Sequence, residues 1–290
     1  MATACCPLLC PAIFVGAGGV RADAEPAPKP EPDWIPSIST AIGFQYQAVG
    51  ASVSSSLRGV TPGEETIVMP IVPVGLQLQA PRIRALPGAP RVFVHGEFQF
   101  TPTPSRTLAR QGDPGFIDVP AAGDIFRSQN PDSVAGQGQS FEASYTYQWV
   151  AGIGLAFPVT VLGRPVELKS SIDYMGQFVE FEAQVANLAC PDGTQMCRGG
   201  PFGVPSYVSG KTDKIFSAIG PRLAAEVDVG NRGPVGVSVF LSAQAYFFVG
   251  DGSASDVYRN AAGDTLQWDY DPDFWVFQAA AGVRFSWKGR

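Results

Sequence analysis

Charged residues, histidine and long apolar segments are all scarce in this sequence. Lysine, arginine, aspartate and glutamate make up 16% of the 290 residues, against about 25% in an ordinary soluble domain. The single histidine and the net charge of −6 leave no basic patch of the kind that binds nucleic acid. No apolar run after Pro36 approaches the ~20 residues of a membrane-spanning helix. The sequence therefore argues against a helical membrane protein and against a nucleic-acid partner.

Residues 1–24 are predicted to be a cleaved signal peptide. A short apolar stretch, broken by proline, is followed by a small-x-small pattern that ends at Ala24. A lipoprotein site at Cys10 is a weaker alternative, because a bulky residue precedes this cysteine and a proline follows it. The lack of a basic residue before the apolar stretch leaves an upstream start codon open. We expect residues 25–36 to form a proline-rich periplasmic segment.

Two cysteines, Cys190 and Cys197, remain in the expected mature chain. They enclose a short turn with glycine and aspartate, and in an exported protein such a pair most simply forms a disulfide. A metal site is the alternative, but it would need further ligands, and none lies near in the sequence. We therefore predict a disulfide between Cys190 and Cys197, and neither a metal nor a cofactor.

Strand-like alternation dominates the rest of the chain. From Trp275 to Trp287 every second residue is apolar, and the residues between are small or polar. A period of two indicates an extended strand whose two faces meet different surroundings. Such runs are about 10–15 residues long, as in transmembrane strands of ~9–11 residues rather than soluble strands of ~5–6. Eight runs are found: Ser37–Ala48, Ile71–Ala80, Arg91–Phe100, Ser144–Phe157, Val166–Phe178, Ile215–Gly230, Val235–Val249 and Trp275–Trp287.

The connections between these runs alternate in length. The longer ones are residues 48–65, 101–140, 179–214 and 250–273, and the shorter ones are residues 81–90, 158–165 and 230–234. Outer-membrane barrels alternate long external loops with short periplasmic turns in this way. We predict an all-β, antiparallel, up-and-down transmembrane barrel of eight strands over residues 37–290. The longer connections leave room for one more hairpin, so ten strands is the alternative.

On these runs and connections, the chain resembles the bacterial outer-membrane β-barrel proteins, in particular the small eight-stranded OmpA/OmpX-like class. The resemblance extends to a C-terminal strand that ends on an aromatic residue, which the barrel-insertion machinery reads in that class. Here three more residues follow Trp287. The resemblance implies the outer membrane of a Gram-negative bacterium, with the lipid bilayer and lipopolysaccharide as surroundings. Aromatic girdles at the two interfaces are expected from Tyr145, Tyr147, Trp149, Phe157, Trp275, Phe277, Phe285 and Trp287.

The polar face of the runs is expected to point into the lumen, which eight strands leave just wide enough for side chains to fill. Side chains of both signs should pair across neighbouring strands and satisfy one another as a polar plug. A narrow path for water or ions is the alternative. The predicted lumen network is Glu97, Glu167, Lys169, Asp173, Arg222, Glu226 and Arg284, with several glutamines.

His95 and an acidic segment near the C-terminus are the remaining candidates for chemistry. His95 falls on the lumen face, without a flanking serine or a G-x-S-x-G motif, so we predict a hydrogen-bonding role rather than a catalytic base. Asp269, Asp271 and Asp273 have the spacing that opens a calcium loop. Phe274 stands where that loop needs glycine, and no bidentate glutamate follows at the required distance. We expect an acidic surface loop, with loose divalent binding left open.

The expected function is that of a non-enzymatic membrane scaffold that displays long extracellular loops for surface contact and supports the envelope. A small passive pore for ions or small solutes is the alternative. A lipid-modifying enzyme is the least favoured of the three hypotheses. The ligand of the loops does not follow from the sequence, because loop specificity obeys no general code.

Overall fold

The computed structural model describes residues 34–113, 137–188, 205–250 and 252–287, and all their regular structure is β-strand. The expected signal peptide and the Cys190–Cys197 pair lie outside these residues. No helix within them is long and apolar enough to cross a membrane. The strands are β1 (Ile35–Ser55), β2 (Gly59–Arg82), β3 (Arg91–Phe100), β4 (Ser105–Asp113), β5 (Gln137–Val161), β6 (Arg164–Leu188), β7 (Pro205–Arg232), β8 (Val235–Phe248), β9 (Ala254–Arg259), β10 (Thr265–Pro272) and β11 (Trp275–Trp287).

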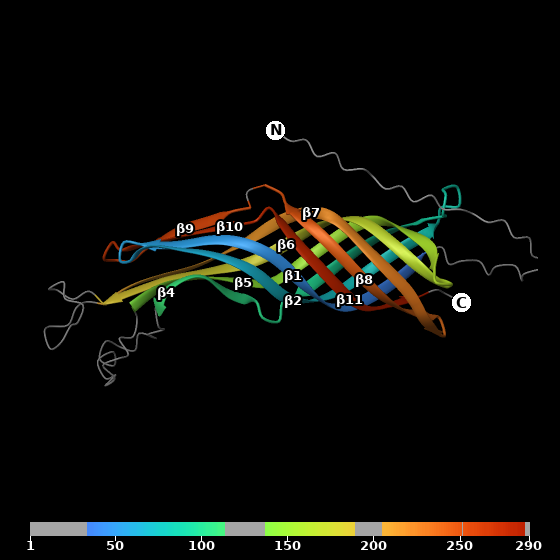
Figure 1. The fold of residues 1–290 in the computed structure, drawn as a ribbon, viewed down its shortest axis with the longest axis horizontal. Coiled ribbons are helices and arrows are strands. Elements are labelled where there is room, and N and C mark those ends of the chain that lie inside the picture. Colours follow the sequence, from blue (N-terminus) through green and yellow to red (C-terminus); the bar gives the residue numbers. More distant parts are fainter. Residues whose placement is uncertain (1–33, 114–136, 189–204, 251, 288–290) are drawn as a thin grey trace, which may run out of the picture. The chain divides into compact units, whose positions relative to one another are not determined.

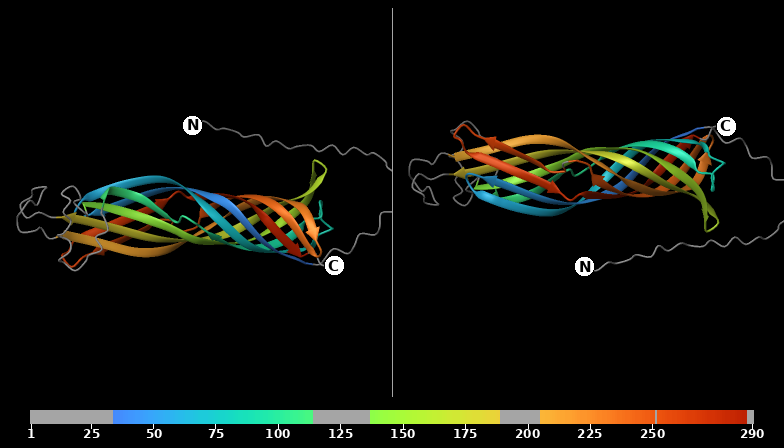
Figure 2. Two further views of the ribbon diagram at one scale, coloured as in Figure 1. Left: turned by 90° about the horizontal axis from the view of Figure 1, so that it is seen from below. Right: turned by 90° about the horizontal axis from the view of Figure 1, so that it is seen from above.

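Eight of these strands close into an antiparallel barrel (Figures 1 and 2). The order around the ring is β1, β2, β3, β5, β6, β7, β8 and β11, and β11 pairs again with β1, for example at Ile38 and Phe285. Closure leaves no unpaired sheet edge in this part of the chain. The eight-stranded antiparallel barrel predicted from the sequence is confirmed. Its first strand begins at Ile35, two residues before the expected boundary.

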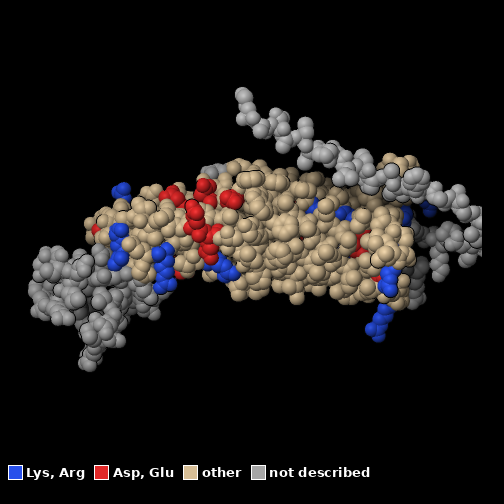
Figure 3. All heavy atoms as spheres, in the orientation of Figure 1, with Lys and Arg blue, Asp and Glu red and all other residues tan. Residues whose placement is uncertain are grey.

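The outward face of the ring is apolar. Ile42 is 74% exposed and Leu76 is 66% exposed, and Figure 3 shows a broad middle zone with few charged atoms on the visible face. An apolar surface of this extent marks contact with a membrane. We call this surface the belt; its members include Ile38, Ile42, Phe44, Val74, Leu76, Val94, Phe98, Ile153, Leu155, Ile172, Ile219, Leu223, Val239, Leu241 and Phe285.

Prolines inside the ring are tolerated through short gaps in the pairing. The ladder between β1 and β2 is interrupted next to Pro73, and the ladder between β7 and β8 is interrupted at Pro221. Proline lacks the backbone N–H that a ladder bond needs. Beside Pro221 the two strands approach so closely that a Cβ on Gly220 would collide with the carbonyl oxygen of Ala245. These prolines therefore lie within the barrel wall, without ending their strands.

Beyond the belt, the ring divides into two four-stranded sheets. We call this part the distal half, and we call the end where β1 begins and β11 ends the proximal end. One sheet has the order β9-β10-β1-β2, and the other has the order β4-β5-β6-β7. Within the described residues, no pairing joins β2 to β4 or β7 to β9. The ring strands β3, β8 and β11 are continued here by separate strands (Figure 1).

The expectation of long external loops is therefore wrong for much of the distal half. The segment 48–65 is a hairpin, because β1 continues to Ser55 and β2 starts at Gly59. The segment 250–273 contains the hairpin of β9 and β10. Extended strands persist here because they bury a second apolar stripe on the inside of the two sheets.

Aromatic side chains fill the space between the two sheets. Phe141 stacks on Trp268 with ring centroids 4.9 Å apart, and Phe181 lies 4.8 Å from the same indole. All three side chains are at most 1% exposed. The inside of the chain thus changes from polar at the belt to apolar in the distal half. We call this interior the aromatic core; it comprises Val49, Val53, Ile67, Met69, Leu108, Ala109, Phe141, Ala143, Tyr145, Val179, Phe181, Ala183, Val185, Val208, Phe216, Leu266, Trp268 and Tyr270.

The prediction that Tyr145 belongs to the aromatic girdle is wrong. Tyr145 is fully buried in the aromatic core rather than facing lipid. The pairing of β5 with β6 shifts register between Tyr145 and Tyr147, and this irregularity reverses the faces of the strand. The other seven predicted girdle residues are half-buried or exposed, and their placement at the membrane interfaces stays a prediction: Tyr147, Trp149, Phe157, Trp275, Phe277, Phe285 and Trp287.

Candidate functional site

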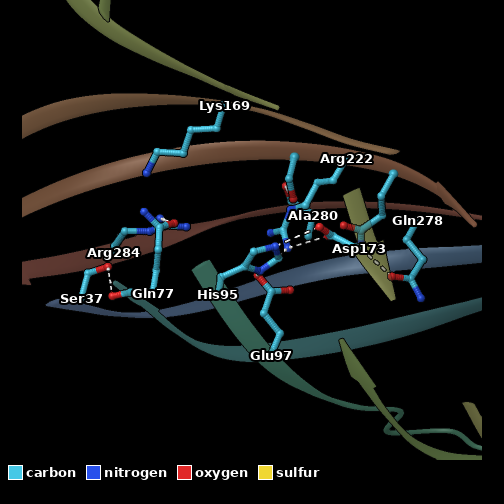
Figure 4. A network of polar contacts seen from close by, with 12 residues as sticks. Ser37, Gln77, His95, Glu97, Lys169, Asp173, Arg222, Gln278, Ala280 and Arg284 are labelled. Atoms are coloured by element: carbon cyan, nitrogen blue, oxygen red, sulfur yellow. Dashed lines mark hydrogen bonds and ion pairs between the residues drawn. The ribbon is translucent and has the colours of Figure 1, made fainter. Parts of the chain in front are cut away.

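The proximal part of the lumen holds a cluster of ion pairs around Glu226, and Figure 4 labels two of its members, Lys169 and Arg284. Lys169 Nζ lies 2.7 Å from Glu226 Oε2 and 3.2 Å from Glu167 Oε2. Arg284 Nη1 lies 3.4 Å from the same Glu226 oxygen, and Ser238 Oγ donates a hydrogen bond to the other. Three strands, β6, β7 and β11, supply these ionised groups, because each places every second side chain inward.

A second cluster around Arg222 lies next to the first along the lumen. Arg222 Nη1 is 2.6 Å from Glu97 Oε1 and 3.9 Å from Asp173 Oδ2. His95 Nε2 is 3.0 Å from Asp173 Oδ1, and His95 Nδ1 is 3.5 Å from Arg222 Nη1. Since a guanidinium only donates, this geometry assigns Nδ1 as an acceptor and Nε2–H as the donor to Asp173. His95 thus bridges Arg222 and Asp173 through its two ring nitrogens.

Gly152 makes the bond between His95 and Asp173 possible. It lies on β5, directly between His95 on β3 and Asp173 on β6. A Cβ at this position would collide with Asp173 Oδ1 and would lie 2.6 Å from His95 Nε2. Gly152 could not be predicted from the alternation of the sequence, because its importance depends on the register of three strands.

Charges of opposite sign balance within the lumen. The seven residues predicted from the sequence come together here as three cations and four carboxylates. Arg91 shares the inward face of β3 with His95 and is 5% exposed, so it supplies a fourth cation. Its position in the alternation would have identified it. Because unpaired buried charge is costly, this balance favours a stable plug.

A ring of glutamines lies on the distal side of the two charged clusters. Gln148 lies opposite Gln99 and Gln177, and Gln278 lies opposite Gln45 and Gln244. The two rows are joined, since Gln148 Nε2 donates to Gln45 Oε1 at 2.6 Å and Gln278 Nε2 donates to Gln148 Oε1 at 2.7 Å. We call the six residues the glutamine ring; they are Gln45, Gln99, Gln148, Gln177, Gln244 and Gln278, all at most 4% exposed.

Hydrogen bonds continue from the glutamine ring to the aromatic core. Gln45 Nε2 donates to Gln47 Oε1 at 3.3 Å, and Gln47 Nε2 donates to Tyr270 at 3.4 Å. The hydroxyls of Tyr270 and Tyr145 lie 3.0 Å apart at the base of the aromatic core. The interior therefore contains a charged, an amide and an aromatic layer in this order, and a small apolar cluster that includes Val150 and Met175 lies beside the glutamine ring.

The acidic segment near the C-terminus lies on a strand, so the expectation of a surface loop is wrong. Asp269 and Asp271 belong to β10, whose extended backbone cannot wrap around a calcium ion as an EF-hand loop does. Ser52 Oγ donates to Asp269 Oδ2 at 3.3 Å from the neighbouring strand. Within the described part of the chain, no group of three or more His, Cys, Asp or Glu residues has the geometry to hold a metal ion.

Several solved structures are similar to this chain, whereas no family model and no curated protein matches its sequence. Neisserial surface protein A is 12% identical over 84% of this chain and 95% of its own, with a TM-score of 0.26. Ail of Yersinia pestis is 7% identical over 85% and 98%, with a TM-score of 0.23. The outer membrane protease OmpT of Escherichia coli is 10% identical over 88% and 97%, with a TM-score of 0.28.

Sequence identities and TM-scores this low do not support any functional conclusion. The class of the protein follows from its own structure. A closed antiparallel ring of eight strands carries an apolar belt outside and paired charges inside. These features define a transmembrane β-barrel of the bacterial outer-membrane type.

Proposed function

We propose that this protein is a non-conducting outer-membrane scaffold that holds a rigid two-sheet platform outside the membrane for surface contact. The observation that carries the proposal is the aromatic core. It occupies the interior at the level where a pore would need a water-filled opening. Phe141, Phe181 and Trp268 are all essentially inaccessible to solvent there.

Opening a path through the aromatic core would be energetically demanding. Emptying the space of a single buried Phe or Trp costs about 3–5 kcal/mol in typical cores. A conducting path would need to displace several such side chains together and hydrate the apolar surface around them. The charged and amide layers add further direct contacts across the lumen, such as Arg222 to Glu97 and Gln148 to Gln45.

The distal half also fits a display role. Its two sheets are held together by a core of their own, so they can present a fixed outer surface. At this distal end β4 ends and β5 begins, and β6 ends and β7 begins. We include in the proposal a cleaved signal peptide ending near Ala24, a disulfide between Cys190 and Cys197, and membrane insertion guided by β11. Lipopolysaccharide and the bilayer are the proposed surroundings.

Single-channel recording in a planar lipid bilayer tests this function. Refolded protein, shown to be folded by its heat-dependent shift in gel mobility, should give no discrete current steps. Arg222→Ala should also be silent, because the aromatic core remains in place. Discrete steps from the wild type that change with Arg222→Ala would make the lumen a conducting path and would overturn the scaffold in favour of the pore.

A further inference from the structure

Two amides of the glutamine ring are buried without partners. Gln99 and Gln177 are both 0% exposed, and they flank Gln148 on either side. Among the described residues, neither the Nε2 nor the Oε1 atom of either side chain has a hydrogen-bond partner. Buried amides in native proteins are satisfied by protein groups or by ordered water. A closed layer of this kind therefore requires a bound polar species.

The adjoining charged layer also contains buried polar atoms without hydrogen-bond partners among the described residues. The hydroxyl of Tyr246 and the Oδ2 atom of Asp173 are buried and form no hydrogen bond with the described side chains. Both residues are 0% exposed. Gln244 Oε1 in the neighbouring ring is likewise unpartnered within the described residues. These groups continue the row of unsatisfied atoms from the glutamine ring toward the proximal end.

A cavity of about 10 Å³, measured as the space open to the centre of a water molecule, lies further along the lumen. This is about the least volume that can hold one water. Two of the residues that line it, Ser171 and Arg284, have buried polar atoms, Oγ and Nε, without a partner in the described chain. Both side chains are at most 5% exposed.

We propose that the lumen at the level of the belt binds a file of internal water molecules. One binding site for water is the cavity between Ser171 and Arg284, and the other is the glutamine ring at Gln99 and Gln177. An internal water typically makes about three hydrogen bonds. Water can both donate and accept, so it serves the amide nitrogens and oxygens of the ring alike.

Charge balance favours water over a small anion in this file. The cavity is lined by Lys169, Arg222 and Arg284, but each of these cations already pairs with a carboxylate. An added anion would leave the buried network with excess negative charge in a medium of low dielectric. A neutral ligand that donates as well as accepts fits the same donors and leaves the balance intact.

The file is accessible from the proximal end only. The aromatic core closes the distal end, whereas the Glu167 side chain beside Lys169 is 26% exposed, against 4% for Lys169 itself. Water and protons can therefore reach Asp173 and His95 from the proximal side without crossing the barrel. The file hydrates the lumen without opening a path across it, and this part of the inference rests on the proposed scaffold function.

Nuclear magnetic resonance of the folded barrel in lipid nanodiscs tests this inference. The side-chain amides of Gln99 and Gln177 should show exchange or Overhauser cross-peaks with water, and Gln99→Leu and Gln177→Leu should each remove one assigned pair. Gln278 is the matched control, since its Nε2 donates to Gln45 and Gln148. Its water cross-peaks should be weaker.

Amides of Gln99 and Gln177 without water cross-peaks beyond those of Gln278, with contacts to Gln148 instead, would overturn the inference. A second measurement concerns access. In sealed vesicles with the barrel in one orientation, a water-soluble paramagnetic agent should relax these amides when it is added on the proximal side. Relaxation only from the distal side would contradict the one-sided file. Neither measurement depends on current through the barrel, so a failure of the water-file inference can be told apart from a failure of the proposed scaffold function.

Discussion

A single methyl group on Gly152 should break the hydrogen bond between His95 and Asp173. The added Cβ would collide with Asp173 Oδ1 and lie 2.6 Å from His95 Nε2. Side chains cannot approach a Cβ so closely, so at least one partner must move. Neither can move far, because both side chains are at most 5% exposed and the cavity beside His95 has room for about one water molecule. A buried carboxylate would then lose one of its hydrogen bonds.

The expected magnitude follows from the charge of Asp173. A hydrogen bond to a charged group contributes about 1.5–3 kcal/mol to stability, and leaving such a group unsatisfied has a similar cost. Gly152→Ala should therefore lower the free energy of unfolding by about this amount. Urea titration of the barrel in lipid vesicles, followed by tryptophan fluorescence and by gel mobility, measures the difference.

Gly230→Ala is the matched control, since a Cβ on Gly230 would have no atom within 4 Å. This variant should stay within about 0.5 kcal/mol of the wild type, as surface substitutions usually do. Equal stability of Gly152→Ala and Gly230→Ala would mean that His95 and Asp173 do not form the described contact.

Three further outcomes are expected in the same unfolding assay. Phe181→Ala should cost about 3–5 kcal/mol, because it empties the centre of the aromatic core; a loss below 1 kcal/mol would mean that the distal sheets are not packed together. Ile42→Arg should cost about 2–4 kcal/mol near the middle of the belt, whereas Val60→Arg, at a 69% exposed position near the distal start of β2, should be close to neutral. A hydrogen bond from Lys211 to Glu182, with N and O 2.6 Å apart, raises the pKa of Lys211 above its ordinary 10.5. The small stabilisation from this exposed pair should be complete below that ordinary value and lost as the pH rises through the raised pKa, and a pH-independent difference between wild type and Lys211→Gln would contradict it.

The ring could be predicted from the sequence because each ring strand separates two very different surroundings. Lipid outside and paired charge inside impose a period of two, and the alternation at Trp275–Trp287 shows both faces at once. Which charged residues share the lumen also follows from this alternation. Which atoms touch does not, because contacts such as His95 with Asp173 depend on the register across β5.

The distal half was harder to predict for a physical reason. Its strands face water on the outside with small residues such as Gly50 and Ser52, which resemble the composition of loops. In the sequence, its inward-facing apolar residues give the same period-two alternation as the lipid-facing residues, shifted by one position. In β5 the two stripes meet at the irregularity between Tyr145 and Tyr147. Alternation alone does not reveal where the faces exchange, and this explains the error at Tyr145.

The apolar side of the strands faces lipid at the belt and faces inward in the distal half. Trp149 is 39% exposed on the outer face of β5, directly opposite Phe98 of the belt, and Trp268 lies inside the aromatic core. Two variants that each retain one of these, with the remaining tryptophans of the chain's five replaced by phenylalanine, allow a direct measurement. In vesicles of brominated lipid, the fluorescence of Trp149 should be strongly quenched. Trp268 should be quenched neither by the lipid nor by acrylamide in the water. Strong lipid quenching of Trp268 would instead place the inner apolar stripe of the distal half in the membrane.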